Sequence, residues 1–368
     1  DPSAHFQIAT WTGNTTAPRN ITNDGNSNLK PDFIWSKNRT SAGTNHVITN
    51  STFGFDAPNA PGSGGQLSID GSGGVNTPAA TYGYISAHLT DGFTIASGGS
   101  NDDTHNENSS EFVGYQWKLN GGTTSTNNDG NITTTVQANT TSGVSIITYD
   151  GQGTQTGKTV GHGLGAVPKM IISKDRDATS NVPNWRTYHV ELGNTKYLNL
   201  DTTGAASVYN DWDNTDPTSS VYSVGGAGGY TPTNTNNTEY ISFVFTDIQG
   251  FSKFGSYTGN GDNNGPFVYT GFKPHFVLIK NVDATQVAIM YDGARKPINR
   301  DDNVASLYAS ETSAEYTGAS YHNLDILSNG FKIRLTDASQ NGSGVKYVYM
   351  AFAKNPFVTS TGIPTTAR

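Results

Sequence analysis

An internal repeat constrains the fold of this chain more than any other feature of its sequence. The clearest copy runs from Phe254 to Lys280 and reads FGSYTGNGDNNGPFVYTGFKPHFVLIK. Degenerate copies begin at the aromatic anchors Trp11 and Tyr149, which correspond to Tyr257. The anchors are separated by 138 and 108 residues, and a proline that precedes a lysine by six positions recurs at intervals of 137 and 106 residues. These proline–lysine pairs are Pro31 and Lys37, Pro168 and Lys174, and Pro274 and Lys280. Two landmarks that move together along a chain indicate tandem units, here three.

The residues between these landmarks predict an all-β fold. Short apolar runs alternate with turns rich in Gly, Asn, Thr and Ser, and helical periodicity is almost absent. Glycine alone accounts for 43 of 368 residues, and charged residues for 14%, against roughly 25% in an average globular protein. This pattern is typical of sandwiches and barrels. We therefore expect three tandem β-sandwich, jelly-roll-like units of about 105–120 residues each.

The repeat also sets the expected boundaries. The units are predicted at residues 1–118, 143–253 and 254–358, with a linker at 119–142 and a polar C-terminal tail at 359–368. The linker holds one candidate edge strand, Ile132 to Val136, and residues 56–82 are expected to form a long surface loop. The second unit runs almost directly into the third, so these two should pack tightly, and the first two more loosely. The start at Asp1 without a methionine suggests a processed protein or a piece of a longer one.

Charge and composition exclude several classes of function. The net charge of −8 argues against nucleic-acid binding, which needs clustered lysine and arginine. No apolar run of about 18 residues occurs, so membrane insertion is not expected. The chain has no cysteine, which removes disulfides, thiolate metal sites and cysteine nucleophiles.

No motif predicts catalysis or a bound metal. The loop Gly151 to Thr159 resembles a phosphate-binding loop, but its glycine spacing fits neither register and we expect a hairpin tip. The acidic clusters would suit Ca²⁺, yet the ligand spacing of a calcium loop is missing. The eight histidines show no paired spacing, and no Gly-x-Ser-x-Gly elbow is present. The chain is therefore expected to be no enzyme, with no catalytic residue, metal or cofactor, although a carboxylate pair assembled in space would escape sequence reading.

Aromatic residues of the second unit are the candidate binding residues. Trp212 lies between Asp211 and Asp213 in a polar insert, where burial in a core is not expected. An exposed ring flanked by carboxylates suits the face of a sugar, and it equally suits a contact between subunits. We therefore assign Trp212, Trp185, Tyr230, Asp211 and Asp213 as candidate ligand- or receptor-binding residues. The repeated proline and lysine are interpreted as structural, with the lysine capping the far end of a strand.

The repeated blocks resemble a family of virion proteins from marine tailed bacteriophages, especially cyanophages. The segments that carry the resemblance are YTGNG at Tyr257 to Gly261, GFxPxFVxIKN at Gly271 to Asn281, the block Asp325 to Lys332, and YxYMAFAxNPF at Tyr347 to Phe357. The resemblance spans nearly the whole chain, is strongest over 143–358, and departs most over 41–110. It includes no catalytic motif.

The resemblance implies a non-enzymatic tail-fibre or surface protein of a phage particle, located on the extracellular virion surface. Its expected partners are copies of itself, as a trimer by family analogy, and other virion proteins, with a host cell-surface glycan as a further candidate. A purely structural role in a capsid, tail or fibre shaft is the alternative. A polysaccharide-degrading spike and a secreted bacterial adhesin are weaker alternatives.

Overall fold

The protein is described from a computed structural model, which covers residues 1–52, 66–71, 82–99, 103–176, 184–295, 299, 305–318 and 322–354. Within these ranges antiparallel strands form several sheets, which confirms the predicted all-β sandwich class. A short 3-10 helix, η1 (Pro2–Ala4), precedes the first strand. No helix in the described ranges has the length and apolar character needed to cross a bilayer. The predicted tail at 359–368 and most of the loop at 56–82 lie outside the described residues.

Each unit contains a main sheet, and the strand order is similar in all three. In the first unit the order is β1 (Phe6–Thr12), β8 (Glu111–Trp117), β3 (Phe33–Asn38), β4 (Val47–Asn50) and β5 (Leu67–Ser68). In the second it is β11 (Val144–Asp150), β18 (Glu239–Phe245), β13 (Met170–Asp175), β14 (Arg186–His189), β15 (Lys196–Asn199) and β16 (Ser207–Val208). In the third it is β19 (Ser252–Thr258), β26 (Lys346–Ala353), β21 (Pro274–Asn281), β22 (Ala288–Asp292) and β23 (Leu307–Tyr308).

A smaller outer sheet covers one face of each main sheet. The outer sheets are β2 (Arg19–Ile21), β7 (Gly92–Ala96) and β6 (Tyr84–Leu89) in the first unit, β12 (Lys158–Gly161) and β17 (Val221–Val224) in the second, and β20 (Asn264–Tyr269), β25 (Gly330–Arg334) and β24 (Asn323–Leu327) in the third. A separate apolar cluster lies between the two layers of each unit. Each unit is thus a two-layer sandwich in which the first strand pairs with the last and the second with the penultimate.

The repeated aromatic-x-Gly segment forms the same clamp in each unit. In the third unit Tyr257 stacks on Tyr347 of the closing strand, with ring centroids 5.0 Å apart, and donates its hydroxyl hydrogen to the carbonyl of Gln340 at 2.7 Å. The side-chain oxygen of buried Asn341 accepts from the backbone N–H of Asn260 at 2.9 Å. The equivalent stacked pairs are Trp11 with Phe112 and Tyr149 with Tyr240, and the equivalent amides are Asn106 and Asn234.

The glycine of this clamp has a steric reason. A Cβ atom on Gly259 would lie 2.3 Å from the carbonyl oxygen of Gly342, which is far inside van der Waals contact. The equivalent glycines are equally confined: a Cβ on Gly13 or Gly151 would lie 2.0 Å from a backbone oxygen of the loop before the closing strand. The repeated aromatic-x-Gly segment therefore marks the place where the first strand of each unit contacts the closing strand and the loop before it.

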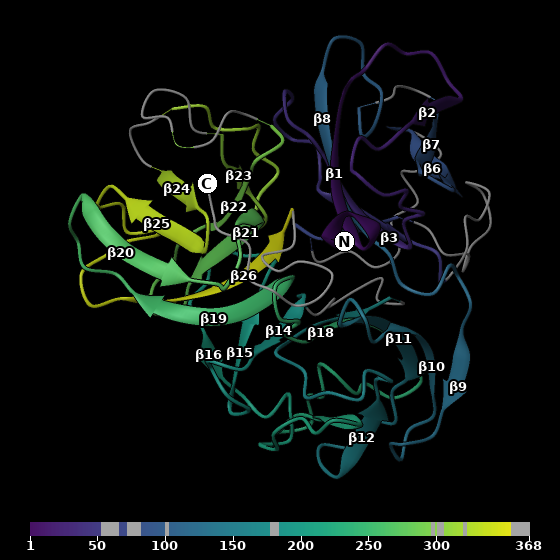
Figure 1. Ribbon diagram of the computed structural model, residues 1–368. Helices are drawn as coiled ribbons and strands as arrows, with labels where there is room; N and C mark the ends of the chain where they lie inside the picture. The colour runs from purple at the N-terminus through teal and green to yellow at the C-terminus, as the bar shows by residue number, and fades with distance from the viewer. Residues whose placement is uncertain are drawn as a thin grey trace.

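The inner faces of the three main sheets converge on one central core. Figure 1 shows the units, coloured purple to blue, teal, and green to yellow, arranged around a common centre. Closing strands are buried on both faces, so in β18 Phe243 points into the central cluster and Val244 into its own sandwich. Aromatic rings meet across the unit boundaries: Phe33 stacks on Phe243 at 4.5 Å, and Phe6 on Phe352 at 5.1 Å. The core joins all three units.

Two expectations about how the units connect are wrong. Residues 119–142 do not form a free linker, because β10 (Thr134–Asn139) pairs with β11 and β9 (Ser125–Asn127) pairs with β10, extending the second main sheet. The first and second units are not loosely joined either, since both contribute to the central core. The candidate edge strand at Ile132 to Val136 overlaps β10, but β10 lies inside the sheet between β11 and β9. The true edge is β9, whose polar residues gave no strand signal, because an edge strand needs few apolar side chains.

The repeated lysines cross the boundaries between units. Lys37 donates from Nζ to the carbonyl of Thr44 in its own unit and, at 3.2 Å, to that of Thr312 in the third. Lys280 likewise donates to the carbonyl of Gln286 in its own unit and, at 3.2 Å, to that of Thr202 in the second. Burial lowers the pKa of Lys37, of Lys280 and of the equivalent Lys174 to about 8. Lys37 and Lys280 therefore fasten neighbouring units to each other, in addition to ending their own strands.

Candidate functional site

The two tryptophans assigned as binding residues are buried. Trp212 is 1% exposed and packs between Tyr188 and Tyr222 in the core of the second sandwich, with its indole N–H donating to the carbonyl of Lys196 at 3.1 Å. Trp185 is fully buried in the central core and donates to the carbonyl of Ser68 in the first unit at 2.9 Å. Their assignment as ligand-binding residues is wrong: polar neighbours in sequence did not keep Trp212 at the surface, because its insert folds back over the sheet.

Tyr230, in contrast, lies at the surface of the second unit. It ends the segment Val224-Gly225-Gly226-Ala227-Gly228-Gly229-Tyr230, in which Ala227 and Tyr230 pair across a tight turn. Gly228 and Gly229 adopt φ angles of +59° and +84°, which glycine takes without strain. The ring of Tyr230 is 44% exposed. The glycine-rich run thus presents one aromatic side chain to solvent.

Arg186 joins this tyrosine to two others. Its guanidinium carbon lies 3.9 Å from the ring centroid of Tyr197, a stacked cation–π arrangement. The ring of Tyr209 lies edge-on to Tyr197 at 6.5 Å and tilted to Tyr230 at 6.0 Å. The hydroxyl of Tyr209 donates to the carbonyl of Ala227 at 2.6 Å, which fixes the turn. We call Arg186, Tyr197, Tyr209 and Tyr230 the tyrosine cluster.

Asp211 lies beneath the tyrosine cluster as its buried counter-charge. Its carboxylate lies 3.5 Å from Nε of Arg186, and neither of its oxygens has a hydrogen-bond partner among the described residues. Burial raises the pKa of Asp211 to about 6, and the nearby guanidinium opposes this rise. Burial would lower the pKa of Arg186, but Asp211, Tyr197 and Tyr230 outweigh it and raise this pKa. The pair therefore holds the guanidinium in place against the rings.

Asp213 does not belong to the tyrosine cluster. It is half-buried, and its carboxylate accepts from the backbone N–H of Gly157 at 2.7 Å, which ties the insert to the loop before β12. Of the five assigned residues, the structure therefore brings together Tyr230 and Asp211. Sequence reasoning missed Arg186, Tyr197 and Tyr209. The available signal was the alternation of Tyr197, Leu198, Asn199 and Leu200, which is typical of a half-buried strand; in β15 Leu198 is buried and Tyr197 is only partly buried.

Chemically, the cluster offers two kinds of contact side by side. Tyrosine rings provide flat apolar faces, and the tyrosine hydroxyls and guanidinium N–H groups provide hydrogen bonds. Because Asp211 balances the charge of Arg186, the cluster suits a polar ligand with little net charge.

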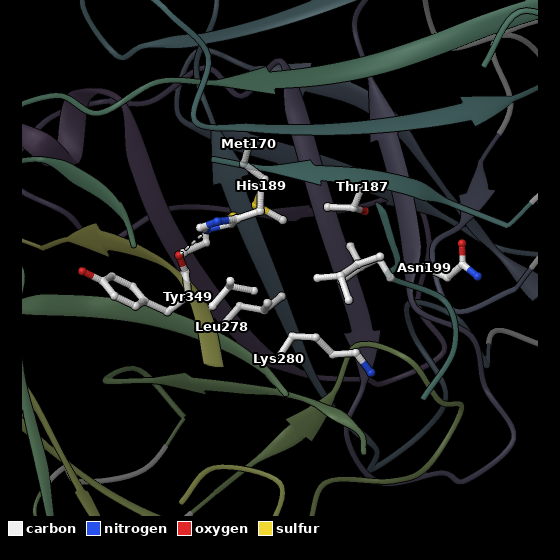
Figure 2. A pocket seen from close by; sticks show the side chains of 11 residues that line it. Met170, Thr187, His189, Asn199, Leu278, Lys280 and Tyr349 are labelled. Carbon is white, nitrogen blue, oxygen red and sulfur yellow. Dashed lines mark hydrogen bonds between the residues drawn. The ribbon is translucent and has the colours of Figure 1, made fainter. Parts of the chain in front are cut away.

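A second concave feature lies inside the protein, between the main sheets of the second and third units. Figure 2 shows it lined by Met170, His189, Leu278 and Tyr349, with the His189 Nε2–H donating to the carbonyl of Tyr349 at 3.2 Å. The void measures about 10 Å³, close to the smallest volume that holds one water molecule. Burial lowers the pKa of His189 to about 4, so the imidazole is neutral at pH 7. This void belongs to the packing between units.

Potential metal-binding side chains are spread along the part of the chain that the structure describes. Within the described ranges, no group of three or more His, Asp or Glu side chains is placed to hold a metal ion. The loop Gly151 to Gly157 connects β11 of the main sheet to β12 of the outer sheet. These two strands do not pair with each other, so the expected hairpin tip is wrong.

One family matches the chain over almost its whole length. The family, described as a domain of unknown function (DUF7483), matches residues 1–356 and so covers all three units as one domain. No curated protein and no solved structure matches the chain. This agrees with the shared central core, since a unit cut out alone would expose one face of its main sheet. The chain belongs to the DUF7483 family.

Proposed function

We propose that this chain is a non-enzymatic surface protein of a bacteriophage particle, with the tyrosine cluster as a contact site for the host. The phage assignment is supported by the resemblance of the repeated blocks Tyr257 to Gly261 and Tyr347 to Phe357 to virion proteins. On this proposal the protein lies on the extracellular virion surface, next to other virion proteins and to copies of itself. The expected ligand is a host cell-surface glycan.

The observation that carries the attachment role is that Tyr230 is exposed on a turn held by hydrogen bonds and packing. A binding residue on a loop loses conformational entropy when it is immobilised, and this reduces affinity. Here the turn is fixed by Tyr209, the neighbouring ring of Tyr197 stands on strand β15, and the buried Arg186–Asp211 pair supports both. The rings are therefore largely ordered before a ligand arrives, as rigid aromatic anchors are in other binding surfaces.

The test is host adsorption by phage particles that carry Tyr230→Ala. We expect the adsorption rate constant to fall at least tenfold, with the yield of assembled particles unchanged because the side chain is half exposed. Tyr269→Ala is the matched control, since this tyrosine is 62% exposed on β20 of the third unit. Wild-type adsorption by the Tyr230→Ala particles would contradict the proposal and favour a purely structural role in the virion.

A further inference from the structure

A cavity in the first unit has the properties of a second binding site. It measures about 310 Å³ and lies beside the loop that connects β3 to β4. Ligand pockets in proteins measure about 300–1,000 Å³, so this one matches a single small ring and not an extended chain. Its polar lining consists of Thr44, Asn45, Gln66, Tyr82, Asp103 and Thr104. Val47 adds one buried apolar side chain.

Gln66 supplies the observation that points to a ligand. The residue is 5% exposed, and its Nε2 donates to the carbonyl of Gly83 at 3.2 Å. Its Oε1 is buried and has no hydrogen-bond partner among the described residues. An unsatisfied buried acceptor costs about 1–3 kcal/mol, which a donor placed in the cavity would recover. A hydroxyl group is the simplest such donor.

Hydrogen bonds within the protein hold several of the groups that line the cavity. The hydroxyl of Thr104 donates to the carbonyls of Tyr82 and Gly83 at 2.5 and 2.8 Å, which fixes the backbone that carries the Tyr82 ring. The side-chain amide of Asn45 donates to the hydroxyl of Ser68 at 2.8 Å. The Tyr82 ring remains 38% exposed. The backbone that carries the Tyr82 ring and the side-chain amide of Asn45 are thus both held by hydrogen bonds.

Charge narrows the class of ligand. The described lining residues include no lysine, arginine or histidine, so nothing in them balances a phosphate, sulfate or carboxylate. Asp103 instead adds an acidic residue to the lining, and a carboxylate repels anions. A ring that carries several hydroxyls and no negative charge satisfies the amide, carboxyl and aromatic groups together.

We propose that this cavity binds one neutral saccharide ring, with Gln66 Oε1 accepting a hydroxyl hydrogen and Tyr82 contacting the sugar face. The site extends the proposed attachment function to the first unit, and the binding itself does not depend on the tyrosine cluster. It places two separate carbohydrate contacts on one chain.

The test is saturation-transfer difference NMR on the full chain with D-galactose, D-glucose, N-acetyl-D-glucosamine and D-glucuronate. We expect signal from at least one neutral sugar and at least tenfold weaker binding of D-glucuronate. Tyr82→Ala and Gln66→Leu should each weaken binding of the neutral sugar at least tenfold, and Tyr269→Ala should leave it unchanged. Because Gln66 is buried and its change could disturb folding, the exposed Tyr82 decides the result.

Three results would overturn the inference: no signal from any neutral sugar, equal binding of D-glucuronate, or unchanged binding in Tyr82→Ala. The outcome is separable from that of the attachment proposal. Sugar binding that depends on Tyr82, together with normal adsorption of Tyr230→Ala particles, would support the cavity site and refute only the proposal that the tyrosine cluster binds the host. Loss of adsorption in Tyr230→Ala particles without sugar binding in the cavity would refute only the cavity.

Discussion

The buried lysines make the stability of this fold increase between neutral and mildly alkaline pH. Burial lowers the pKa of Lys280 from 10.5 to about 8, and that of Lys174 likewise. Between those two values the unfolded chain holds more protons than the folded chain. The free energy of unfolding therefore rises with pH in this window, and the gain is complete above the unfolded pKa.

The size of the effect follows from the shift. From pH 7 to pH 9 each of these two lysines adds about 1.3 kcal/mol to the free energy of unfolding, at about 1.36 kcal/mol per pKa unit. Together they add about 2.6 kcal/mol, and Lys37 acts in the same direction. With an unfolding entropy of about 2.1 cal/mol/K per residue, this corresponds to a rise in Tm of about 3–4 °C for a chain of 368 residues.

The assay is urea unfolding at pH 7, 8 and 9, followed by tryptophan fluorescence. These conditions stay below the range in which buried tyrosines such as Tyr222, whose pKa burial raises, would reverse the trend. Lys280→Met should reduce the gain from pH 7 to pH 9 by about 1.3 kcal/mol. Lys273→Met, which alters an exposed lysine just before β21, is the control and should keep the wild-type gain. Equal gains in wild type and Lys280→Met would refute the reasoning.

Three further predictions concern stability. Trp212→Ala should lower the free energy of unfolding by about 3–5 kcal/mol, measured by urea denaturation, and a loss below 1 kcal/mol would show that the ring is not in the core. Arg295→Met removes the charge partner of buried Asp292 and one of the two arginine partners of Glu315, the other being Arg39. It should cost about 3–5 kcal/mol by calorimetry, and an unchanged Tm would contradict the ion-pair network. Gly259→Ala should lower the free energy of unfolding by about 1–3 kcal/mol, because its Cβ would collide with a backbone oxygen. Gly204→Ala is the control and should cause no such loss, since a Cβ there lies 3.5 Å from its nearest neighbour. Equal losses of stability in the two variants would refute the steric role of Gly259.

Local patterns in the sequence predicted the sandwich class and marked the positions that fasten each unit. The anchors Trp11, Tyr149 and Tyr257 are visible because each is followed two positions later by a glycine. What they contact is not visible, because the stacking partner and the buried asparagine lie about 80 to 100 residues away in the chain. Only folding shows why that glycine cannot carry a side chain.

The relation between units was harder to predict. The run Tyr240-Ile241-Ser242-Phe243-Val244-Phe245 is apolar at nearly every position, which is typical of a strand buried on both faces. A single sandwich buries only one face of such a strand, so the run already implied a neighbour on the other side. The exposure of Trp212 was predicted wrongly because the prediction rested on the polar composition of its segment. Composition reports the average environment of a segment and not the direction of one side chain.

The central core has a consequence for how such a surface can vary. In an assembly of three identical chains, every substitution appears three times, and any binding site is presented with threefold symmetry. Here a single chain supplies all three units, so a feature of one unit, such as the glycine-rich turn at Gly228 and Gly229 in the second, occurs once per molecule. The shared core and the clamps can stay alike while each outward surface changes independently. One chain can thus display three different faces around one shared core, and its contacts with other molecules have a direction.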